Sequence, residues 1–214
     1  RESQTLYEFL VPLVKGYSTE TSLEVVNHGV QVHGGMGYIE ETGAAQYYRD
    51  AKILTIYEGT TAIQANDLVG RKTLRDGGQT ALLVAQRVQR TEQQLATRDD
   101  AAQAVARHLA AARQAFESAV RFIAENGKGD PNAAFAGSVP YLMLAGNMVA
   151  GWQLAESLLV AQEKLAAGDD VDFMRAKVAT ARFYAEHILP RTEALSQAVV
   201  EGAGSVMALA EADF

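Results

Sequence analysis

The 214-residue sequence contains no cysteine, only four prolines and a single tryptophan. Without cysteine the chain has no disulfide, no thiolate nucleophile and no cysteine-ligated metal site, which suits a reducing cytoplasm. Cations are also in the minority, with 19 lysines and arginines against 26 aspartates and glutamates and a net charge of −7. A nucleic-acid-binding face needs clustered cations to replace the counterions around phosphates, so we expect no nucleic-acid partner.

Long apolar runs and a targeting segment are lacking as well. No apolar run approaches the roughly 18 residues that a membrane span needs, and the opening residues have no start methionine, no basic n-region and no small-residue cleavage site. We therefore expect a cytoplasmic protein without a membrane span or signal peptide. Because the sequence opens inside a helical pattern, we also expect it to be a fragment of a longer protein.

Helical periodicity dominates what is present. Hydrophobic residues make up 48% of the chain and charged residues 21%, as in folded proteins. Apolar residues recur at helical spacing in residues 144–158 and 174–188, and glycine-rich or proline breaks at residues 127–131, 168–170 and 190 separate the helices. The clearest stripe steps by four and three residues through Val105, Leu109, Ala112, Phe116, Ala119 and Ile123. With no strand-length alternation, the pattern predicts an all-α chain.

A boundary falls at Asp76-Gly77-Gly78. We predict an up-and-down helical bundle over residues 1–76 and a second antiparallel helical bundle, appended to it, over residues 77–214. In the first unit, cap residues at 18–21 predict a new helix start, and closely spaced glycines break the helix at residues 34–38. Thr60 or Thr61 predicts the start of a helix that runs to about Leu74.

Glu58 is the carboxylate with the most distinctive surroundings. It follows the apolar Ile56 and the aromatic Tyr57, and it stands beside Gly59 just ahead of a predicted helix start. Burial raises the pKa of a carboxyl group, whereas a helix N-terminus lowers it. The residues alone leave two interpretations open, a poised carboxylate base or an ordinary residue at a helix N-terminus.

Three motifs in fixed order within residues 31–60 favour the first interpretation. They are Gln31-Val32-His33-Gly34-Gly35-Met36-Gly37-Tyr38, Tyr48-Arg49-Asp50-Ala51-Lys52-Ile53 and Ile56-Tyr57-Glu58-Gly59-Thr60. Together they closely resemble the C-terminal helical domain of flavin-dependent acyl-CoA dehydrogenases, with a match from residue 1 to about Lys72. Residues 77–214 resemble the helical extension of the longer, often bacterial, members of that family.

The resemblance implies a reaction and a base. Glu58 would remove the α-proton of an acyl-CoA thioester while the β-hydrogen leaves as hydride to FAD, giving a trans-2-enoyl-CoA. The backbone N–H of Glu58 would help to hold the thioester carbonyl, with Gly59 also at the substrate. Such hydrogen bonds are needed because an α-proton is too weak an acid for a carboxylate unless the enolate-like charge is stabilised.

The resemblance also implies cofactor and partner contacts. Gln31, Val32, His33, Gly34 and Gly35 would approach the adenosine-diphosphate part of an FAD held mainly by a neighbouring subunit, since glycines let backbone N–H groups come close to a pyrophosphate. Thr60 would contact the flavin of its own subunit, whereas Ala62 stands where many relatives carry a glutamine that touches the cofactor. Electron-transfer flavoprotein as electron acceptor and a homo-oligomeric assembly are carried over with the family.

Other functions stay open. The N-terminal helical domain and the β-barrel of the family have no counterpart here, so we expect the chain to be inactive by itself. An acyl-CoA oxidase, which passes its electrons to O₂, and a non-catalytic helical interaction or oligomerisation module are the alternatives.

The remaining polar and aromatic residues are expected to be structural. Arg49 and Asp50 are expected to form a structural ion pair. His28 and His33 are five residues apart and do not share a helix face, so no metal site is predicted. Phe116, Phe135 and Trp152 are expected in the core.

Overall fold

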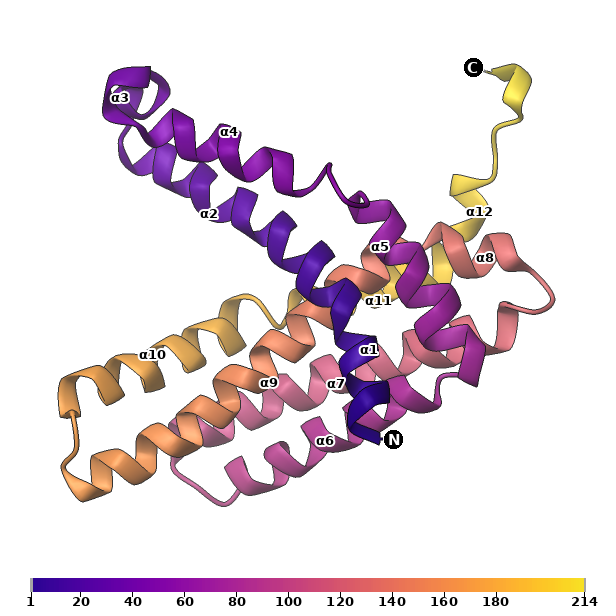
Figure 1. Ribbon diagram of the computed structural model, residues 1–214. Helices are drawn as coiled ribbons and strands as arrows, with labels where there is room; N and C mark the ends of the chain where they lie inside the picture. Colours follow the sequence, from indigo (N-terminus) through magenta and orange to yellow (C-terminus); the bar gives the residue numbers. More distant parts are fainter. Residues whose placement is uncertain (1, 214) are drawn as a thin grey trace.

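Helices account for every regular element of residues 2–213, the range that the computed structural model describes. Two of them, α2 (Ser18–Val32) and α4 (Ala44–Leu54), extend together as an arm away from the long helices α6, α7, α9 and α10 (Figure 1). The all-α prediction is therefore confirmed. No helix within residues 2–213 has both the length and the apolarity to cross a membrane.

The remaining elements follow in chain order. Those before residue 77 are α1 (Glu2–Pro12), η1 (Leu13–Tyr17), α3 (Gly35–Tyr38), η2 (Glu40–Thr42), α5 (Thr61–Asp67), η3 (Leu68–Thr73) and η4 (Leu74–Asp76). Those after it are α6 (Gln79–Leu95), α7 (Asp100–Asn126), α8 (Pro131–Ala136), α9 (Ser138–Ala167), α10 (Val171–His187), α11 (Arg191–Glu201), α12 (Ala203–Val206) and η5 (Glu211–Asp213). The turns η1 and η3 are π-helical, and both lie inside longer continuous helices.

The first helix is continuous from α1 through η1 into α2, so the predicted helix start at residues 18–21 is wrong. The hydroxyl groups there do not cap a new helix. Thr19 donates to the carbonyl oxygens of Lys15 (2.7 Å) and Gly16 (3.1 Å), and Ser22 donates to the carbonyl of Thr19 (2.6 Å). Serine and threonine also make such back-bonds inside helices, and here they accompany the widened π-helical turn.

The arm is held by contacts between its own two helices. No side chain of α2 is buried, and α4 buries only Ala51. Gly37 allows α3 to close onto α2, because a Cβ atom there would stand 2.3 Å from the carbonyl oxygen of Val30. The arm leaves large apolar side chains exposed, among them Val25, Val32, Met36, Tyr38, Tyr47 and Ile53.

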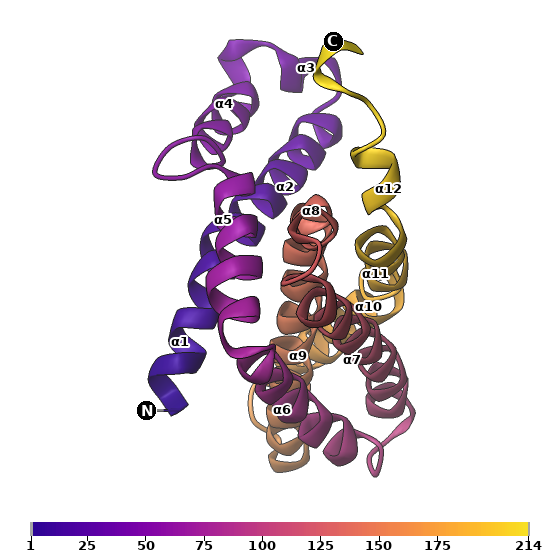
Figure 2. The same ribbon diagram turned by 90° about the vertical axis from the view of Figure 1, so that its right-hand side faces the viewer.

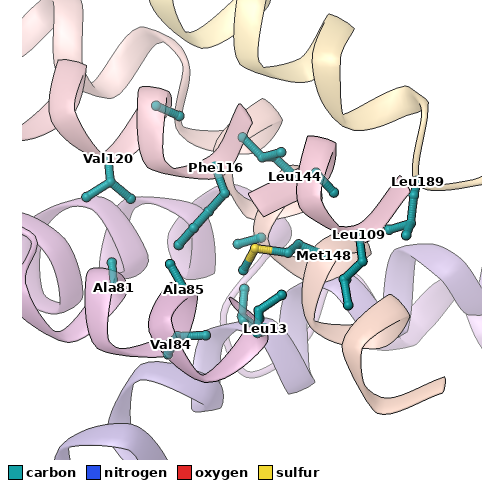
Figure 3. Packing of buried hydrophobic residues seen from close by; sticks show 14 of the residues in the cluster. Leu13, Ala81, Val84, Ala85, Leu109, Phe116, Val120, Leu144, Met148 and Leu189 are labelled. Carbon is teal, nitrogen blue, oxygen red and sulfur yellow. The ribbon is translucent and has the colours of Figure 1, made fainter. Parts of the chain in front are cut away.

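One hydrophobic core receives side chains from both sides of Asp76 (Figure 3). Phe9 of α1 packs edge-on against Phe116 of α7 with centroids 6.4 Å apart, and Phe116 stacks on Tyr141 of α9 at 5.7 Å. The Tyr141 hydroxyl lies 3.0 Å from the Thr73 hydroxyl, and burial raises the pKa of Tyr141 so that its proton stays in place. The division at Asp76 stays a prediction, with a shared core across it.

The predicted stripes lie where the periodicity places them. All six residues of the α7 stripe are buried, as are Leu144, Met148, Ala155 and Leu158 of α9. In α10, Ala181 and Ala185 are buried while Met174 and Val178 are half-buried, as is Ile188 directly after the helix. Phe116 is in the core as predicted, but Phe135 and Trp152 only pack against it and are partly buried.

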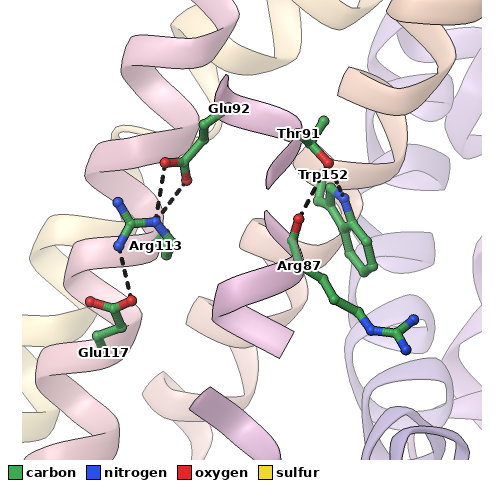
Figure 4. A network of polar contacts seen from close by, with 6 residues as sticks. All are labelled: Arg87, Thr91, Glu92, Arg113, Glu117 and Trp152. Carbon is green, nitrogen blue, oxygen red and sulfur yellow. Dashed lines mark hydrogen bonds and ion pairs between the residues drawn. The ribbon is translucent and has the colours of Figure 1, made fainter. Parts of the chain in front are cut away.

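Two polar clusters link the bundle helices (Figure 4). Arg113 of α7 donates through Nε to both carboxylate oxygens of Glu92 (2.9 and 3.1 Å) and through Nη1 to Glu117 (2.9 Å). The Glu92 and Arg113 side chains are only 9% and 10% exposed. Burial raises the pKa of Glu92 although the hydrogen bond and charge of Arg113 lower it. In the second cluster, the indole N–H of Trp152 in α9 donates to the Thr91 hydroxyl of α6 (2.8 Å).

The first prediction concerns the buried cation. Arg113→Met should lower the free energy of unfolding by about 3 kcal/mol, because it leaves two carboxylates without their cation in a largely buried place. Urea unfolding followed by circular dichroism measures the loss. Glu92→Gln, which removes one buried charge, serves as the control and should cost clearly less.

The loss should depend on pH in a defined direction. A carboxyl group whose pKa is raised in the folded state favours folding most at low pH, and that contribution disappears as pH rises through the folded-state value. Removal of Arg113 raises the pKa of Glu92 further, so the deficit of Arg113→Met should shrink at about pH 4, near the ordinary carboxyl value. A deficit that grew on acidification would contradict this assignment.

Candidate functional site

Glu58 lies in a strained turn between α4 and α5. The turn continues from the end of α4, with the N–H groups of Ile56 and Tyr57 bonded to the carbonyl of Ile53 at 3.0 and 3.1 Å. Glu58 then adopts φ +53°, and Gly59 follows at φ +96°. Apart from glycine, residues rarely adopt positive φ, and the cost is of order 1–3 kcal/mol at sites where the surroundings impose it. Glu58 is therefore a backbone outlier, and within residues 2–213 Asp170, at φ +43°, is another.

The Glu58 turn presents backbone donors together with an exposed carboxylate. Within residues 2–213, neither the backbone N–H of Glu58 nor that of Gly59 makes a backbone hydrogen bond of normal geometry. The Glu58 side chain is exposed. One short segment therefore offers a carboxylate and two adjacent backbone donors, and α-proton removal next to a carbonyl requires such a combination.

Contacts from the first helix reach both ends of this turn. The ammonium group of Lys15, in η1, donates to the carbonyl of Leu54 and lies 4.9 Å from the centroid of the Tyr57 ring. At the other end the Thr61 hydroxyl, at the start of α5, donates to the carboxylate of Glu20. Glu58 thus stands between two points that are fixed by one helix.

The five residues predicted to approach a cofactor, Gln31, Val32, His33, Gly34 and Gly35, lie at the far tip of the arm. All five are exposed. Gly34 has φ +60°, and its N–H donates to the carbonyl of Gln31 at 3.0 Å. A Cβ atom added at Gly34 or Gly35 would meet nothing within 4 Å, so the backbone there is open to an approaching group.

The structure does not bring this tip together with Glu58, Gly59 and Thr60. The 11-residue helix α4 separates them, a length of about 16 Å at 1.5 Å per residue. Figure 1 shows α3 at the outer end of the arm and the α4–α5 connection at its base. Within one chain, the two predicted contact regions are two separate places.

The helix predicted to start at Thr60 or Thr61 begins there, with Thr60 at the N-cap position of α5, although the Thr60 side chain makes no capping hydrogen bond and Thr61 is engaged with Glu20. One local prediction needs correction. Arg49 does not pair with its neighbour Asp50, because adjacent helical residues point in different directions. Arg49 pairs with Glu40 at 3.3 Å, and Asp50 accepts from Gln46 at 2.9 Å.

Sequence reasoning missed Lys15 and Glu20. They lie 39 and 41 residues from their partners, so no local spacing signals them. A lysine within a largely apolar helix is the one hint, since buried ammonium groups need a partner. Within residues 2–213, no group of three or more His, Asp or Glu side chains is arranged to hold a metal ion.

Comparison with known proteins divides the chain into two matching regions. Residues 2–74 match the family described as "Acyl-CoA dehydrogenase, C-terminal domain", and residues 84–210 match "Acetyl-CoA dehydrogenase C-terminal like". The second match alone covers more than half of the chain. Both regions therefore point to one family of proteins.

Individual relatives agree with these matches. The chain is 52% identical over 206 residues to a 3-methylmercaptopropionyl-CoA dehydrogenase of Ruegeria pomeroyi, and the aligned region covers 96% of this chain and 35% of that protein. It is 32% identical over 227 residues to a broad-specificity linear acyl-CoA dehydrogenase of Mycobacterium tuberculosis, and that aligned region covers 97% of this chain and 35% of the relative. A short-chain specific mitochondrial enzyme of Rattus norvegicus is 41% identical over 58 residues, 27% of this chain and 14% of that enzyme. The chain thus spans about a third of the length of the first two.

The second prediction tests the strain at Glu58. Glu58→Gly should raise the free energy of unfolding by up to about 1 kcal/mol, because glycine adopts positive φ without the steric cost. Chemical unfolding measures the change. Gln89→Gly, at an exposed position inside α6, is the control and should lose about 1 kcal/mol. Equal losses in the two variants would show that Glu58 is not strained.

Proposed function

The chain belongs to the acyl-CoA dehydrogenase family, and on that premise we propose that it supplies the catalytic base of an FAD-dependent acyl-CoA dehydrogenase. The reaction is the α,β-dehydrogenation of an acyl-CoA thioester to a trans-2-enoyl-CoA. The base is Glu58. The observation that carries the proposal is the strained, exposed turn in which Glu58 adopts φ +53° within the family's motif.

The side chain and the backbone of the Glu58 turn have different roles in the proposed reaction. The Glu58 carboxylate takes the α-proton of the acyl group. The backbone N–H groups of Glu58 and Gly59 would donate to the thioester carbonyl, where negative charge grows as the proton leaves. Because both donors and the base belong to adjacent residues, their relative positions are set by the backbone of the turn, which needs little reorganisation during the reaction.

The residues also suit a flavin cofactor. At the tip of the arm, the open backbone of Gly34 and Gly35, with Gln31, Val32 and His33 beside it, would hold the adenosine-diphosphate part of an FAD bound by a neighbouring subunit. Thr60, two residues after the base, would contact the flavin of its own subunit. Flavin, when bound, supplies the acceptor for the β-hydrogen. The helix α4 separates the tip from the Glu58 turn, so the two predicted contact regions lie at different places along the arm.

The rest of the enzyme lies outside this chain. Since the chain spans 35% of its two long relatives, the remaining flavin and CoA contacts belong to other parts of those proteins. We therefore propose that residues 1–214 are inactive alone and act within a longer, homo-oligomeric protein. Electron-transfer flavoprotein as electron acceptor and a cytoplasmic location, which the lack of cysteine supports, belong to the same proposal.

The named substrates of the relatives suggest where to look first. The two long relatives are named for a 3-methylmercaptopropionyl-CoA and for linear acyl-CoA substrates. We propose an unbranched acyl-CoA for the complete protein. Turnover with methylmercaptopropionyl-CoA, butyryl-CoA and a branched isobutyryl-CoA, compared by kcat/KM, tests this choice, and a preference for the branched substrate would contradict it.

The third prediction removes the base. Glu58→Gln in the complete protein should lower kcat about 10²–10⁴-fold, the range for loss of a general base, while flavin content stays the same. Flavin bleaching on anaerobic addition of acyl-CoA measures the step directly. Glu125→Gln, at an exposed position of α7, is the control and should bleach at the wild-type rate.

The outcomes also separate the alternatives. Full turnover in Glu58→Gln would exclude Glu58 as the base. A wild-type protein that binds flavin but is not bleached by any acyl-CoA would favour a non-catalytic interaction module. Rapid reoxidation of the bleached flavin by air would identify an acyl-CoA oxidase, whereas slow reoxidation supports a dehydrogenase.

A further inference from the structure

We propose that Lys15 and Glu20 are positioning residues for Glu58, and that Tyr17 between them ties this support to the appended helices α9 and α10. The inference rests on the proposed role of Glu58 as a base. It assigns a task to the first helix, which carries no residue of the motif around Glu58. It also assigns a task to the second half of the chain, for which the sequence offers no chemistry.

Lys15 fixes the near end of the Glu58 turn. A helix leaves its last carbonyl groups without intrahelical donors. Leu54, the last residue of α4, has its carbonyl bonded by the ammonium of Lys15. The same ammonium lies over the ring of Tyr57, the residue before Glu58, at 4.9 Å from the centroid. The Lys15 side chain thus contacts both the backbone of Leu54, four residues before the base, and the side chain of Tyr57, directly before it.

Glu20 fixes the far end. Its carboxylate accepts the hydroxyl proton of Thr61, the first residue of α5. Thr60 provides no capping bond, so this contact is the side-chain anchor at the start of α5. The two positive-φ residues, Glu58 and Gly59, therefore lie between two pinned points. Strained backbone persists only where its surroundings over-determine it, and these two contacts provide that constraint.

Close packing behind the turn leaves little room for the support to move. A Cβ atom at Gly59 would lie 2.9 Å from the side-chain nitrogen of Gln64 in α5. A Cβ atom at Gly16 would lie 3.2 Å from Cβ of the same Gln64 and 2.6 Å from a methyl carbon of Leu142 in α9. Gly16 thus lets η1 approach α5 and α9 together, and a displacement of η1 is transmitted to the start of α5.

Tyr17 connects η1 to the appended helices. Its ring fills the space above Gly146 of α9, where a Cβ atom would stand 2.2 Å from the ring carbons. Its hydroxyl lies 2.8 Å from the hydroxyl of Tyr184 in α10, and Tyr184 donates to the carbonyl of Asn147 at 3.3 Å. Three successive residues of one π-helical turn therefore contact different elements. Lys15 contacts α4, Gly16 faces α5 and α9, and Tyr17 contacts α9 and α10.

The experiment compares matched pairs in the complete, flavin-loaded protein. Lys15→Met and Glu20→Gln remove the two anchors. Lys177→Met is the control for the first, because Lys177 also lies over an aromatic ring, that of Phe173 at 5.1 Å, on α10 and outside the turn. Glu24→Gln is the control for the second, since Glu24 lies one turn further along α2 and pairs with Arg191 at 3.5 Å.

We expect the anchors to affect proton removal and not binding. Lys15→Met and Glu20→Gln should lower kcat about 10–100-fold, the effect of misplacing a catalytic group by about 1 Å, with KM and flavin content within about threefold of wild type. The kinetic isotope effect with α-deuterated acyl-CoA should rise, because proton abstraction becomes slower relative to other steps. Lys15→Arg, which keeps the cation, should recover most of the rate, and both controls should behave as wild type.

Two results would overturn the proposal. One is an unchanged kcat per bound flavin in Lys15→Met and Glu20→Gln. The other is a lower rate with an unchanged isotope effect, as a purely structural role would produce. If Glu58→Gln is inactive in the same assay, either result rejects the positioning role and leaves the base assignment intact. An active Glu58→Gln would instead reject the proposed function. Should Lys15→Met fail to fold, Lys15→Gln takes its place in the same comparison.

The link to the appended helices has its own test. Tyr17→Phe, Tyr184→Phe and the double variant remove one hydroxyl pair while keeping both rings. Each single variant should speed amide hydrogen exchange of residues 54–60 at least about threefold, and the double variant should add nothing further, because coupled partners are not additive. Exchange at wild-type rates in all three variants would show that α10 does not support the turn.

Discussion

The stacked rings of Phe116 and Tyr141, with Phe9 against their edge, form the contact on which the rest of the chain depends. They bring α1, α7 and α9 together, and the bond from Tyr141 to Thr73 adds the end of the α5–η3 helix. All three rings are fully buried. Because the first helix enters the core through Phe9 and Leu13, the direction in which it leaves as α2 is set by this packing (Figure 2). The packing of these three rings therefore sets the orientation of the arm and of the residues at its tip.

The π-helical turn η1 lies where the first helix passes from the core into the arm. The residues before it pack in the core, and the residues after it form α2, one of the two helices of the exposed arm. The wide turn at residues 13–17 lies at this change of surroundings, and its residues contact four other elements. Widened turns of this kind are often found at functional sites. The Glu58 turn is thus supported from η1, through Lys15, and from the first turn of α2, through Glu20.

Much of the fold follows from the sequence, because buried faces have to repeat at the helical period. The sequence pattern predicts the α7 stripe, the helix breaks near residues 127 and 168, and the end of a helix near Pro190. Glu58 is also recognisable, through its motif. Other features depend on three-dimensional proximity. From the sequence, Thr19 could cap the start of a helix or donate to a carbonyl of the preceding turn inside one. The packing around η1 keeps the helix continuous, and Thr19 makes the second kind of bond. Lys15 and Glu20 meet the turn across 39 and 41 residues, which no spacing rule reports.

The length of α4 has a consequence for how such a protein would tolerate damage. The helix, about 16 Å long, lies between the open glycines of the arm tip and the turn that carries Glu58. Under the proposed function, in which the tip contacts the FAD of a neighbouring subunit, one chain contributes its tip to one active site and its base to another. A chain defective only at the tip and a chain defective only at Glu58 would then be complementary, because a mixed oligomer contains one site built from both intact parts. Partial activity restored by mixing two inactive mutants would be a direct signature of this shared architecture.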